Sequence, residues 1–198
     1  MKSVLLALVI APFSSHIASA QPPVASPTLG GAPVPGVCLL SRPAVFATAR
    51  VGAAATARLK QLADQAQAEV DAERKPVEAD AKAFQQDQAK LSSAERQSRA
   101  QALEQRLRAV QQKTALRDRE IEATRERAMA RIVSAMQPVV AQAYQAKGCG
   151  LLIDRGSVLG GNMANDLTPA VIQGLDAKMT AIDFDLESLI SSTSVTRK

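Results

Sequence analysis

Histidine and cysteine, two side chains often used in catalysis, are scarce in this 198-residue sequence, which contains one histidine and two cysteines. Its one histidine, His16, lies in an apolar leader that we expect to be removed, so histidine-based general bases, activated nucleophiles and histidine metal ligands are excluded from the mature chain. Carboxylates are available toward the C-terminus, but none has an obvious acid or base partner; they are Asp154, Asp166, Asp176, Asp183 and Asp185. The sequence therefore predicts no catalytic site and no enzyme activity.

Two further motifs have part of the pattern of a ligand site. Acidic and apolar residues alternate from Asp183 to Glu187, but this run lacks the glycine turn and the ligand spacing of calcium-binding loops. Gly160 and Gly161 lack the additional glycines, or the following lysine and hydroxyl residue, that phosphate-binding loops require. We therefore predict no metal ion and no cofactor.

Cys38 and Cys149 are the two residues for which covalent chemistry is expected. An even number of cysteines in an exported chain favours a disulfide over metal binding. The two cysteines lie at the starts of short apolar segments that flank a long polar region, so a bridge would join the ends of that region. The alternative is a pair of reduced cysteines that are buried as small apolar residues.

The first twenty residues have the pattern of a secretory signal peptide. Lys2 precedes an apolar run from Val4 to Phe13, and the small residues at 18–20 fit a cleavage site. The run has about half of the ~20 apolar residues that a bilayer-spanning helix needs. We therefore expect an exported chain whose mature form begins at Gln21.

Both ends of the mature chain are predicted to lack regular structure. Residues 21–36 contain five prolines and three glycines, a composition that favours a disordered tether. Residues 191–198 are rich in serine and threonine and are predicted to form a flexible tail.

The composition between these ends favours long helices. Ala, Gln, Glu, Arg and Lys dominate residues 53–147, while aromatic residues make up only 3% of the whole chain. Ser92 and Glu95 form a capping box that starts a second helix, and Gly148 supplies the left-handed residue that ends it near Lys147. Two long helices joined by so short a turn run antiparallel, so residues 53–147 are predicted to form a helical hairpin arm.

Short apolar segments flank the arm and predict a small body made of residues 37–52 and 148–190. We expect a strand over 37–42, a second over 149–155 and a third over 157–162. Because two or three short strands do not form a stable sheet alone, partner chains are expected to complete it. The predicted fold class is mainly α, with a small β body that serves as an oligomerisation core.

The body also contains predicted helix boundaries. Pro43 fits the first turn of a helix that ends near Arg50, and Gly52 is expected to separate this helix from the arm. Thr168 is predicted to cap the last helix, with Pro169 in its first position. The apolar face of the last helix is expected to contain Val171, Ile172, Leu175, Met179 and Ile182.

The apolar seam of the predicted hairpin is weak. Acidic residues such as Glu73 and Asp80 stand where a coiled coil needs apolar side chains, and Pro76 removes a backbone hydrogen bond from the first helix. We therefore expect an arm that bends readily. One line of apolar residues keeps the seven-residue spacing, namely Ala63, Val70, Val77, Phe84 and Leu91.

Positive charge is concentrated on the second helix of the hairpin. Residues 94–147 carry eleven basic and six acidic side chains, in a chain whose formal net charge is +5. The simplest interpretation is a solvated helix face with local ion pairs, such as Glu104 with Arg108. The alternative is a positive field that attracts acidic chains or an anionic membrane surface. Nucleic acid is not an expected ligand, because aromatic residues that could stack on bases are missing.

Three segments together resemble the Skp (OmpH-like) family of periplasmic chaperones: residues 36–52, the Ala- and Gln-rich hairpin, and residues 148–176. The last segment is the most specific, since an apolar strand ending in Asp154 is followed by a small-residue turn and by the sequence Asp-Leu-Thr that starts at Asp166. The resemblance implies a homotrimer whose helical arms enclose a cavity. It further implies a periplasmic holdase that binds unfolded outer-membrane proteins without ATP.

Two hypotheses for the function follow. The first is this holdase activity, with client contacts from a basic and sparsely apolar arm. The second is a structural or adaptor hairpin that bridges components of the cell envelope and binds no unfolded chain. For the holdase, the candidate client-binding residues are Arg106, Arg117, Arg125, Leu103, Leu107 and Ile121.

Overall fold

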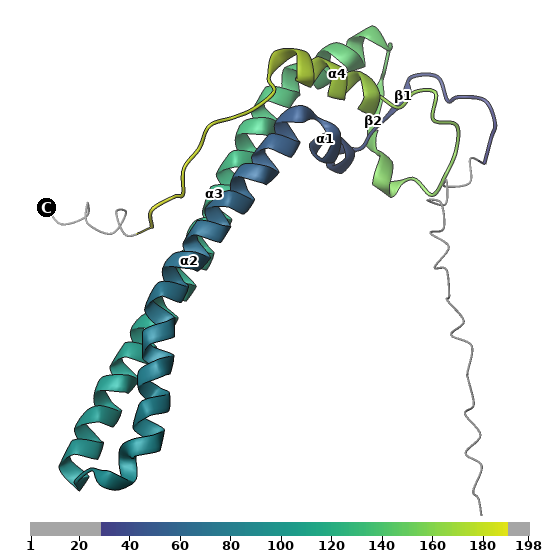
Figure 1. The fold of residues 1–198 in the computed structure, drawn as a ribbon. Coiled ribbons are helices and arrows are strands. Elements are labelled where there is room, and N and C mark those ends of the chain that lie inside the picture. Colours follow the sequence, from purple (N-terminus) through teal and green to yellow (C-terminus); the bar gives the residue numbers. More distant parts are fainter. Residues whose placement is uncertain (1–28, 190–198) are drawn as a thin grey trace, which may run out of the picture.

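The structure, a computed structural model, describes residues 29–189 and is mainly helical. Figure 1 shows two long helices side by side, with the remaining elements gathered at one end of the pair. The elements in chain order are β1 (Val37–Leu40), α1 (Arg42–Thr48), α2 (Arg50–Asp87), the 3₁₀ turn η1 (Gln88–Lys90), α3 (Ser93–Ala146), β2 (Leu151–Asp154), the 3₁₀ turn η2 (Arg155–Ser157) and α4 (Thr168–Lys178). The predicted signal peptide, the first part of the predicted tether and the predicted tail lie outside the described residues.

The long helices α2 and α3 form the predicted hairpin, here called the arm. The 38 residues of α2 correspond to roughly 57 Å of helix at ~1.5 Å per residue. At the tip, the Ser92 hydroxyl accepts from the Glu95 backbone N–H, and the Glu95 carboxylate accepts from the Ser92 N–H at 2.9 Å. This capping box confirms the predicted start of α3, and Gly148 adopts the expected positive φ of 68° just after its end.

The boundary between α1 and α2 differs from the prediction. The break falls at Ala49, and α2 runs without interruption through Gly52. A Cβ atom at Gly52 would lie 1.9 Å from the carbonyl oxygen of Phe46. The predicted break at Gly52 is therefore wrong: this glycine lets the first turn of α2 pack against the backbone of α1.

The sheet of the body contains two parallel strands, not three. β1 pairs with β2 in the register Val37 to Leu151 through Leu40 to Asp154. The predicted third strand over 157–162 is wrong, because the chain turns sharply after β2, where the Asp154 carboxylate accepts from the Gly156 N–H at 2.8 Å. The position beside β1 is taken by a single bridge between Leu39 and Asp166.

The start of α4 also differs from the prediction. Thr168 is the first helical residue and does not cap the helix. Its N–H donates to the Asp166 carboxylate at 2.8 Å, while its hydroxyl oxygen accepts from the Ser41 N–H at 2.9 Å. Asp166 thus holds the turn before α4, and Thr168 ties α4 to α1. The helix ends at Lys178, so Ile182 is buried beyond the helix and not on its face.

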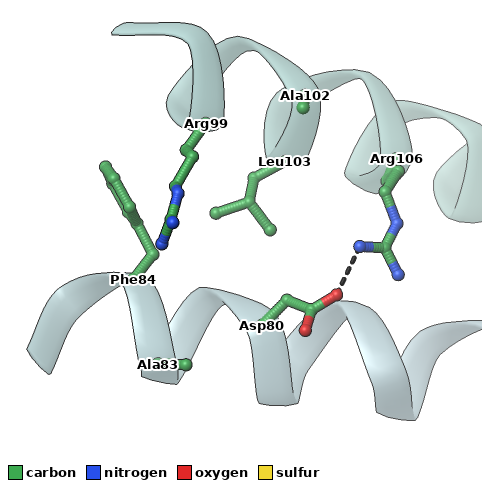
Figure 2. Close-up of a pocket in the computed structure, with 7 residues that line it drawn as sticks. All are labelled: Asp80, Ala83, Phe84, Arg99, Ala102, Leu103 and Arg106. Atoms are coloured by element: carbon green, nitrogen blue, oxygen red, sulfur yellow. Dashed lines mark hydrogen bonds and ion pairs between the residues drawn. The ribbon is translucent and has the colours of Figure 1, made fainter. Parts of the chain in front are cut away.

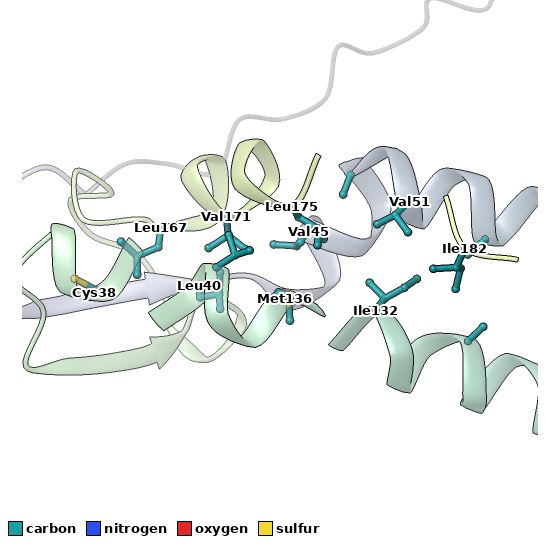
Figure 3. Packing of buried hydrophobic residues seen from close by; sticks show 14 residues of the cluster. Cys38, Leu40, Val45, Val51, Ile132, Met136, Leu167, Val171, Leu175 and Ile182 are labelled. Carbon is teal, nitrogen blue, oxygen red and sulfur yellow. The ribbon is translucent and has the colours of Figure 1, made fainter. Parts of the chain in front are cut away.

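The main apolar core lies where the arm meets the body. Val45 of α1, Val51 of α2, Ile132 of α3, and Val171 and Leu175 of α4 are fully buried in one cluster (Figure 3). Farther along the arm the apolar contacts thin out to a separate small cluster of three valines, Val70, Val77 and Val110. The stability of the fold is therefore concentrated at the base of the arm.

The described end of the predicted tether lies against the body. Residues 29–36 contain neither helix nor strand. The Asn162 side-chain amide donates to the Gly31 carbonyl at 2.8 Å, and the Asn165 amide donates to the Val34 carbonyl at 3.0 Å. These contacts anchor this end of the tether next to β1.

Candidate functional site

The candidate site is the surface of the arm, and its ion pairs show why the apolar seam is sparse. Acidic residues of α2 meet basic residues of α3 at three levels: Glu69 with Arg117, Glu73 with Lys113, and Asp80 with Arg106. The α3 partner number falls as the α2 number rises, as an antiparallel pair requires. The acidic residues found at the expected apolar positions therefore join the two helices by charge.

Arg117, one of the predicted client-binding arginines, is part of the internal structure of the arm. Its Nη1 lies 2.6 Å from the carboxylate of Glu120, whose side chain is 1% exposed, and its Nη2 lies 2.6 Å from Glu69. The hydrogen bond to Glu120 and the bond to Glu69 raise the pKa of the Arg117 guanidinium, against the effect of burial. Arg117 is therefore committed to neutralising a buried carboxylate.

The other two predicted arginines are also paired. Arg106 binds Asp80 across the hairpin, as the dashed line in Figure 2 shows. Arg125 lies 3.1 Å from Glu122 on the same helix, with both side chains more than half exposed. Such an exposed pair contributes at most about 1 kcal/mol and exchanges easily with solvent. Of the three arginines, only Arg125 keeps its charge readily available.

The predicted apolar contacts differ in exposure. Leu107 is 42% exposed. Leu103 and Ile121 are half-buried, and each lines a shallow groove between α2 and α3. Leu103 and Leu107 are one turn apart on α3, whereas Ile121 lies several turns nearer the body, so the structure does not bring all three into one patch.

A groove near the tip of the arm combines apolar and basic groups. It has a volume of about 250 Å³. Figure 2 shows Phe84 rising from α2 beside Arg99, while Leu103 points from α3 toward α2. The Asp80–Arg106 pair closes one end of the groove. An apolar floor with a charged rim suits a short apolar segment of an extended chain.

Arginines that sequence reasoning missed lie beside this groove. Among the residues that the structure describes, Arg96 and Arg99 make no ion pair. The sequence contained a signal, because the only acidic residue within one helical turn of either is Glu95, which is engaged in the capping box. Lys82 on α2 likewise forms no ion pair within the described chain. Three basic residues without an ion pair in the described chain thus lie near the tip, and Lys75 and Arg119 are further examples nearer the body.

The carboxylates near the C-terminus serve the structure of the body and arm. Asp154 lies 3.8 Å from Arg42, Asp176 pairs with Arg50, and Asp185 pairs with Arg58. Within residues 29–189, no group of three or more potential ligands could hold a metal ion. None of the helices described is long and apolar enough to cross a membrane.

Asp166 is the most constrained of these carboxylates. It pairs with Arg155 at 2.8 Å and accepts from the Thr168 N–H. Burial alone would raise the pKa of Asp166, but the hydrogen bonds from Thr168 and Arg155 outweigh burial and hold this pKa below its usual value. The charge of Asp166 therefore stabilises the junction between η2 and α4.

The comparisons with known proteins agree with this architecture. The sequence profile of the family described as "Outer membrane protein (OmpH-like)" matches residues 36–175. A crystal structure of a candidate outer membrane chaperone (OmpH-like) from Caulobacter crescentus is 35% identical in sequence, with a TM-score of 0.73 over 81% of this chain and 95% of that chain. The chain belongs to the OmpH-like family. Among curated proteins, none matches it.

Membership of the OmpH-like family confirms two expectations from the sequence. The resemblance to this chaperone family is correct, and the protein is not an enzyme, since these chaperones are non-enzymatic. Proteins of this family are periplasmic, and the family implies outer-membrane proteins as clients. The OmpH-like match covers β1, the whole arm, β2 and most of α4, whereas residues 29–35 and 176–189 lie outside the matched range.

The two cysteines of this OmpH-like chain are close together at the base of the arm. The structure joins Cys38 and Cys149 in a disulfide, with their Cα atoms 5.8 Å apart. Cys38 is 1% exposed, and Cys149 packs against the main core. Since 111 positions separate the two cysteines, the bridge would enclose nearly the whole arm. Formation of this bond in the exported protein remains a prediction.

Proposed function

We propose that this protein is an ATP-independent periplasmic holdase that binds unfolded outer-membrane proteins between its arms. The observation that carries the proposal is the construction of the arm itself. Two helices of 38 and 54 residues extend beyond the core, and ion pairs in place of a continuous apolar seam join them. Such an arm offers a long surface that adapts its shape without losing the fold of the body.

We further propose that three chains assemble through the body. A sheet of two four-residue strands is too small to be stable by itself. Apolar side chains are exposed on the same part of the molecule, with Leu151 53% and Leu159 106% exposed. Partner chains would cover these side chains, and three arms side by side would enclose a cavity for the client.

In this proposal, electrostatic attraction is the first step of client capture. Arg96, Arg99 and Lys82 give the end of the arm a positive field, which attracts acidic segments of an unfolded chain. Screening acts over about 8 Å at physiological ionic strength, so salt weakens this long-range attraction. The groove lined by Phe84 and Leu103 would then bind apolar side chains that salt does not screen.

The proposal is tested by an aggregation assay. A urea-denatured outer-membrane protein is diluted into buffer without ATP, and light scattering is followed with increasing amounts of the purified chain. A holdase suppresses scattering at about one trimer per client. Undiminished scattering at a large excess of the chain would contradict the proposal and favour the structural or adaptor hairpin.

Two variants with equal loss of charge test the role of the tip. Arg96→Gln with Arg99→Gln removes two arginines that make no ion pair within the described chain, whereas Lys75→Gln with Arg119→Gln removes two exposed basic residues of the same kind nearer the body. At low salt the tip variant should capture client several-fold more slowly than the control variant, and the difference should vanish at high salt. Equal rates for both variants at low salt would show that the tip arginines are only solvated surface.

A further inference from the structure

The segment that follows α4 lies along the base of the arm. We call residues 179–189 the strap. It contains no helix or strand, and in Figure 1 it leaves α4 and descends beside α3. Ile182 is 8% exposed and belongs to the core cluster that also contains Val51 of α2 and Ile132 of α3. Figure 3 shows Ile182 next to Ile132, so the strap contributes side chains to the space between the two arm helices.

Arginines from both arm helices form hydrogen bonds and ion pairs with the strap. Arg58 of α2 donates from Nη2 to the Asp185 carboxylate at 2.8 Å and from Nε to the Phe184 carbonyl at 3.1 Å. Arg127 of α3 lies 2.6 Å from the Glu187 carboxylate. From the next turn, Arg131 also donates to the Asp183 carbonyl at 2.7 Å. Three cationic side chains thus border an acidic segment.

Buried polar groups of α3 accept hydrogen bonds from the backbone of the strap. The Glu187 N–H donates to the hydroxyl oxygen of Thr124 at 2.9 Å, and the Leu189 N–H donates to the Glu120 carboxylate at 3.2 Å. Thr124 and Glu120 are 2% and 1% exposed. Buried acceptors that bind backbone N–H groups recognise an extended chain whatever its side chains are.

The strap sequence alternates in the way an extended chain does. Ile182, Phe184 and Leu186 are buried or half-buried, while Asp183 and Asp185 between them are exposed. This period of two turns one apolar face toward the arm, while the carboxylates of Asp185 and Glu187 meet Arg58 and Arg127. The base of the arm therefore matches one chemical pattern, an extended chain with alternating apolar and acidic residues.

We infer that the groove between α2 and α3 at the base of the arm is a binding site for extended peptide segments with alternating apolar and acidic residues, and that the strap is its internal occupant. A client segment of the same pattern competes with the strap for this groove. Strands of outer-membrane barrels alternate apolar and polar residues, and those client segments whose polar residues are acidic match the groove. The identity of the competitor rests on the proposed function, whereas the groove and its occupant do not.

The competition has a measurable consequence. A tethered strap acts at an effective concentration on the order of millimolar, so it weakens the apparent affinity of any competing peptide. Full-length protein with Ile182→Ser, Phe184→Ser and Asp185→Asn releases the strap and leaves every groove residue unchanged. The probe is a labelled peptide with the sequence of residues 181–189 and blocked ends, followed by fluorescence anisotropy. The released variant should bind this probe at least about tenfold more tightly than the wild type.

Two controls distinguish binding of the probe in the groove from non-specific binding. A peptide of the same composition, with its apolar residues grouped together, should bind neither protein. Adding Arg58→Ala and Arg127→Ala to the released variant should weaken probe binding by at least about fivefold, since both charged contacts are lost. Absence of probe binding to a released variant with wild-type circular dichroism and size, or equal binding to wild type and variant, would overturn the inference.

Hydrogen exchange of the unmodified protein gives a second test that does not depend on the folding of a variant. Addition of a denatured outer-membrane protein should expose the Glu187 and Leu189 amides, which the buried acceptors otherwise protect. Unchanged protection while client is bound would overturn competition by clients. If the wild type fails to suppress client aggregation but the released variant still binds the probe, the proposed function fails and the groove stands.

Discussion

At the scale of single residues, the structure assigns Arg117 to the interior of the arm. Its guanidinium compensates the buried carboxylate of Glu120, and Glu69 completes the network. Reversal of its charge would place a third carboxylate between these two. Substitution of Arg117 by an acidic residue would therefore damage the arm before it reported on client binding.

Replacing Arg117 by Met tests this assignment. The change leaves Glu120 charged and buried without its partner, so the free energy of unfolding should fall by about 3 kcal/mol. Adding Glu120→Gln removes the stranded charge and should restore most of the loss. Urea unfolding at one fixed protein concentration measures both variants. If Arg117→Met alone left the free energy of unfolding unchanged, the buried carboxylate of Glu120 would not depend on Arg117.

Asp166 provides a prediction of pH dependence. Its pKa in the folded protein is held below the usual value, so its contribution to stability is fully present above the unfolded pKa of about 4 and is lost as the pH falls through the lower folded pKa. Asp166→Asn keeps an acceptor for the Thr168 N–H but removes the counter-charge of Arg155. At pH 7 the variant should be less stable by roughly 1–2 kcal/mol.

The stability difference between wild type and Asp166→Asn should shrink as the pH is lowered from about 4. Urea unfolding across this range measures the difference, and Asp154→Asn serves as a control because the Asp154 pair with Arg42 is long and partly exposed. A stability difference between wild type and Asp166→Asn that stays constant or widens at low pH would contradict the stabilising role of the Asp166 charge.

Several of these residue roles could not be predicted from the sequence. The partners of Arg106 and Arg117 across the hairpin lie 26 and 48 positions away, beyond the reach of helical spacing rules. The function of Asp166 was missed for a local reason: Thr168 next to Pro169 looks like a helix cap, whereas the structure has Asp166, two positions earlier, accept from the Thr168 N–H. Local patterns predict which residues are charged, whereas the pairing depends on the register of two long helices.

At the scale of elements, local signals predicted helix ends well where the end is made by neighbouring residues. The capping box of Ser92 and Glu95 and the left-handed Gly148 define α3 from within a few positions. The break between α1 and α2 was mispredicted because Gly52 is needed for contact with Phe46, not for flexibility. The predicted third strand does not form because a turn after β2 overrides the apolar character of residues 157–162.

Gly52→Ala distinguishes these two interpretations of the glycine. Helix propensity alone predicts a gain of about 1 kcal/mol, whereas overlap of the new Cβ with the Phe46 carbonyl predicts a loss of about 2–3 kcal/mol. Gly150→Ala is the matched control, because its Cβ would meet its nearest neighbour, the Gly36 carbonyl oxygen, at 3.7 Å. Thermal unfolding that shows the Gly52 variant to be as stable as the control would refute the packing role.

The disulfide is a prediction about how two elements are joined. A bridge between Cys38 and Cys149 closes a loop of about 110 residues, for which chain entropy gives roughly 4–5 kcal/mol. Replacing both cysteines by alanine should lower the unfolding free energy by up to this amount, with the arm helices retained in circular dichroism. Mass spectrometry of unreduced periplasmic material should find no free thiol. Two thiols open to alkylation would show that the bridge does not form.

At the scale of the whole molecule, the sequence predicted the architecture better than it predicted which residues are available to bind a client. Composition and two caps were enough for a helical hairpin on a small β body, and the family resemblance was correct. The candidate client-binding residues were chosen by charge and hydrophobicity, and the structure uses Arg106 and Arg117 to hold the arm together. Arg96, Arg99 and Lys82 near the tip make no ion pair within the described chain, and the base of the arm is contacted by the strap.

The central claim is that three copies of this chain hold one unfolded outer-membrane protein without ATP. Native mass spectrometry of the purified chain, alone and after mixing with a urea-denatured outer-membrane protein, tests the claim directly. We expect a trimer that gains the mass of one client, and a control with a folded soluble protein of similar size should give the trimer alone. A monomer, or a trimer that gains no client mass, would contradict the claim.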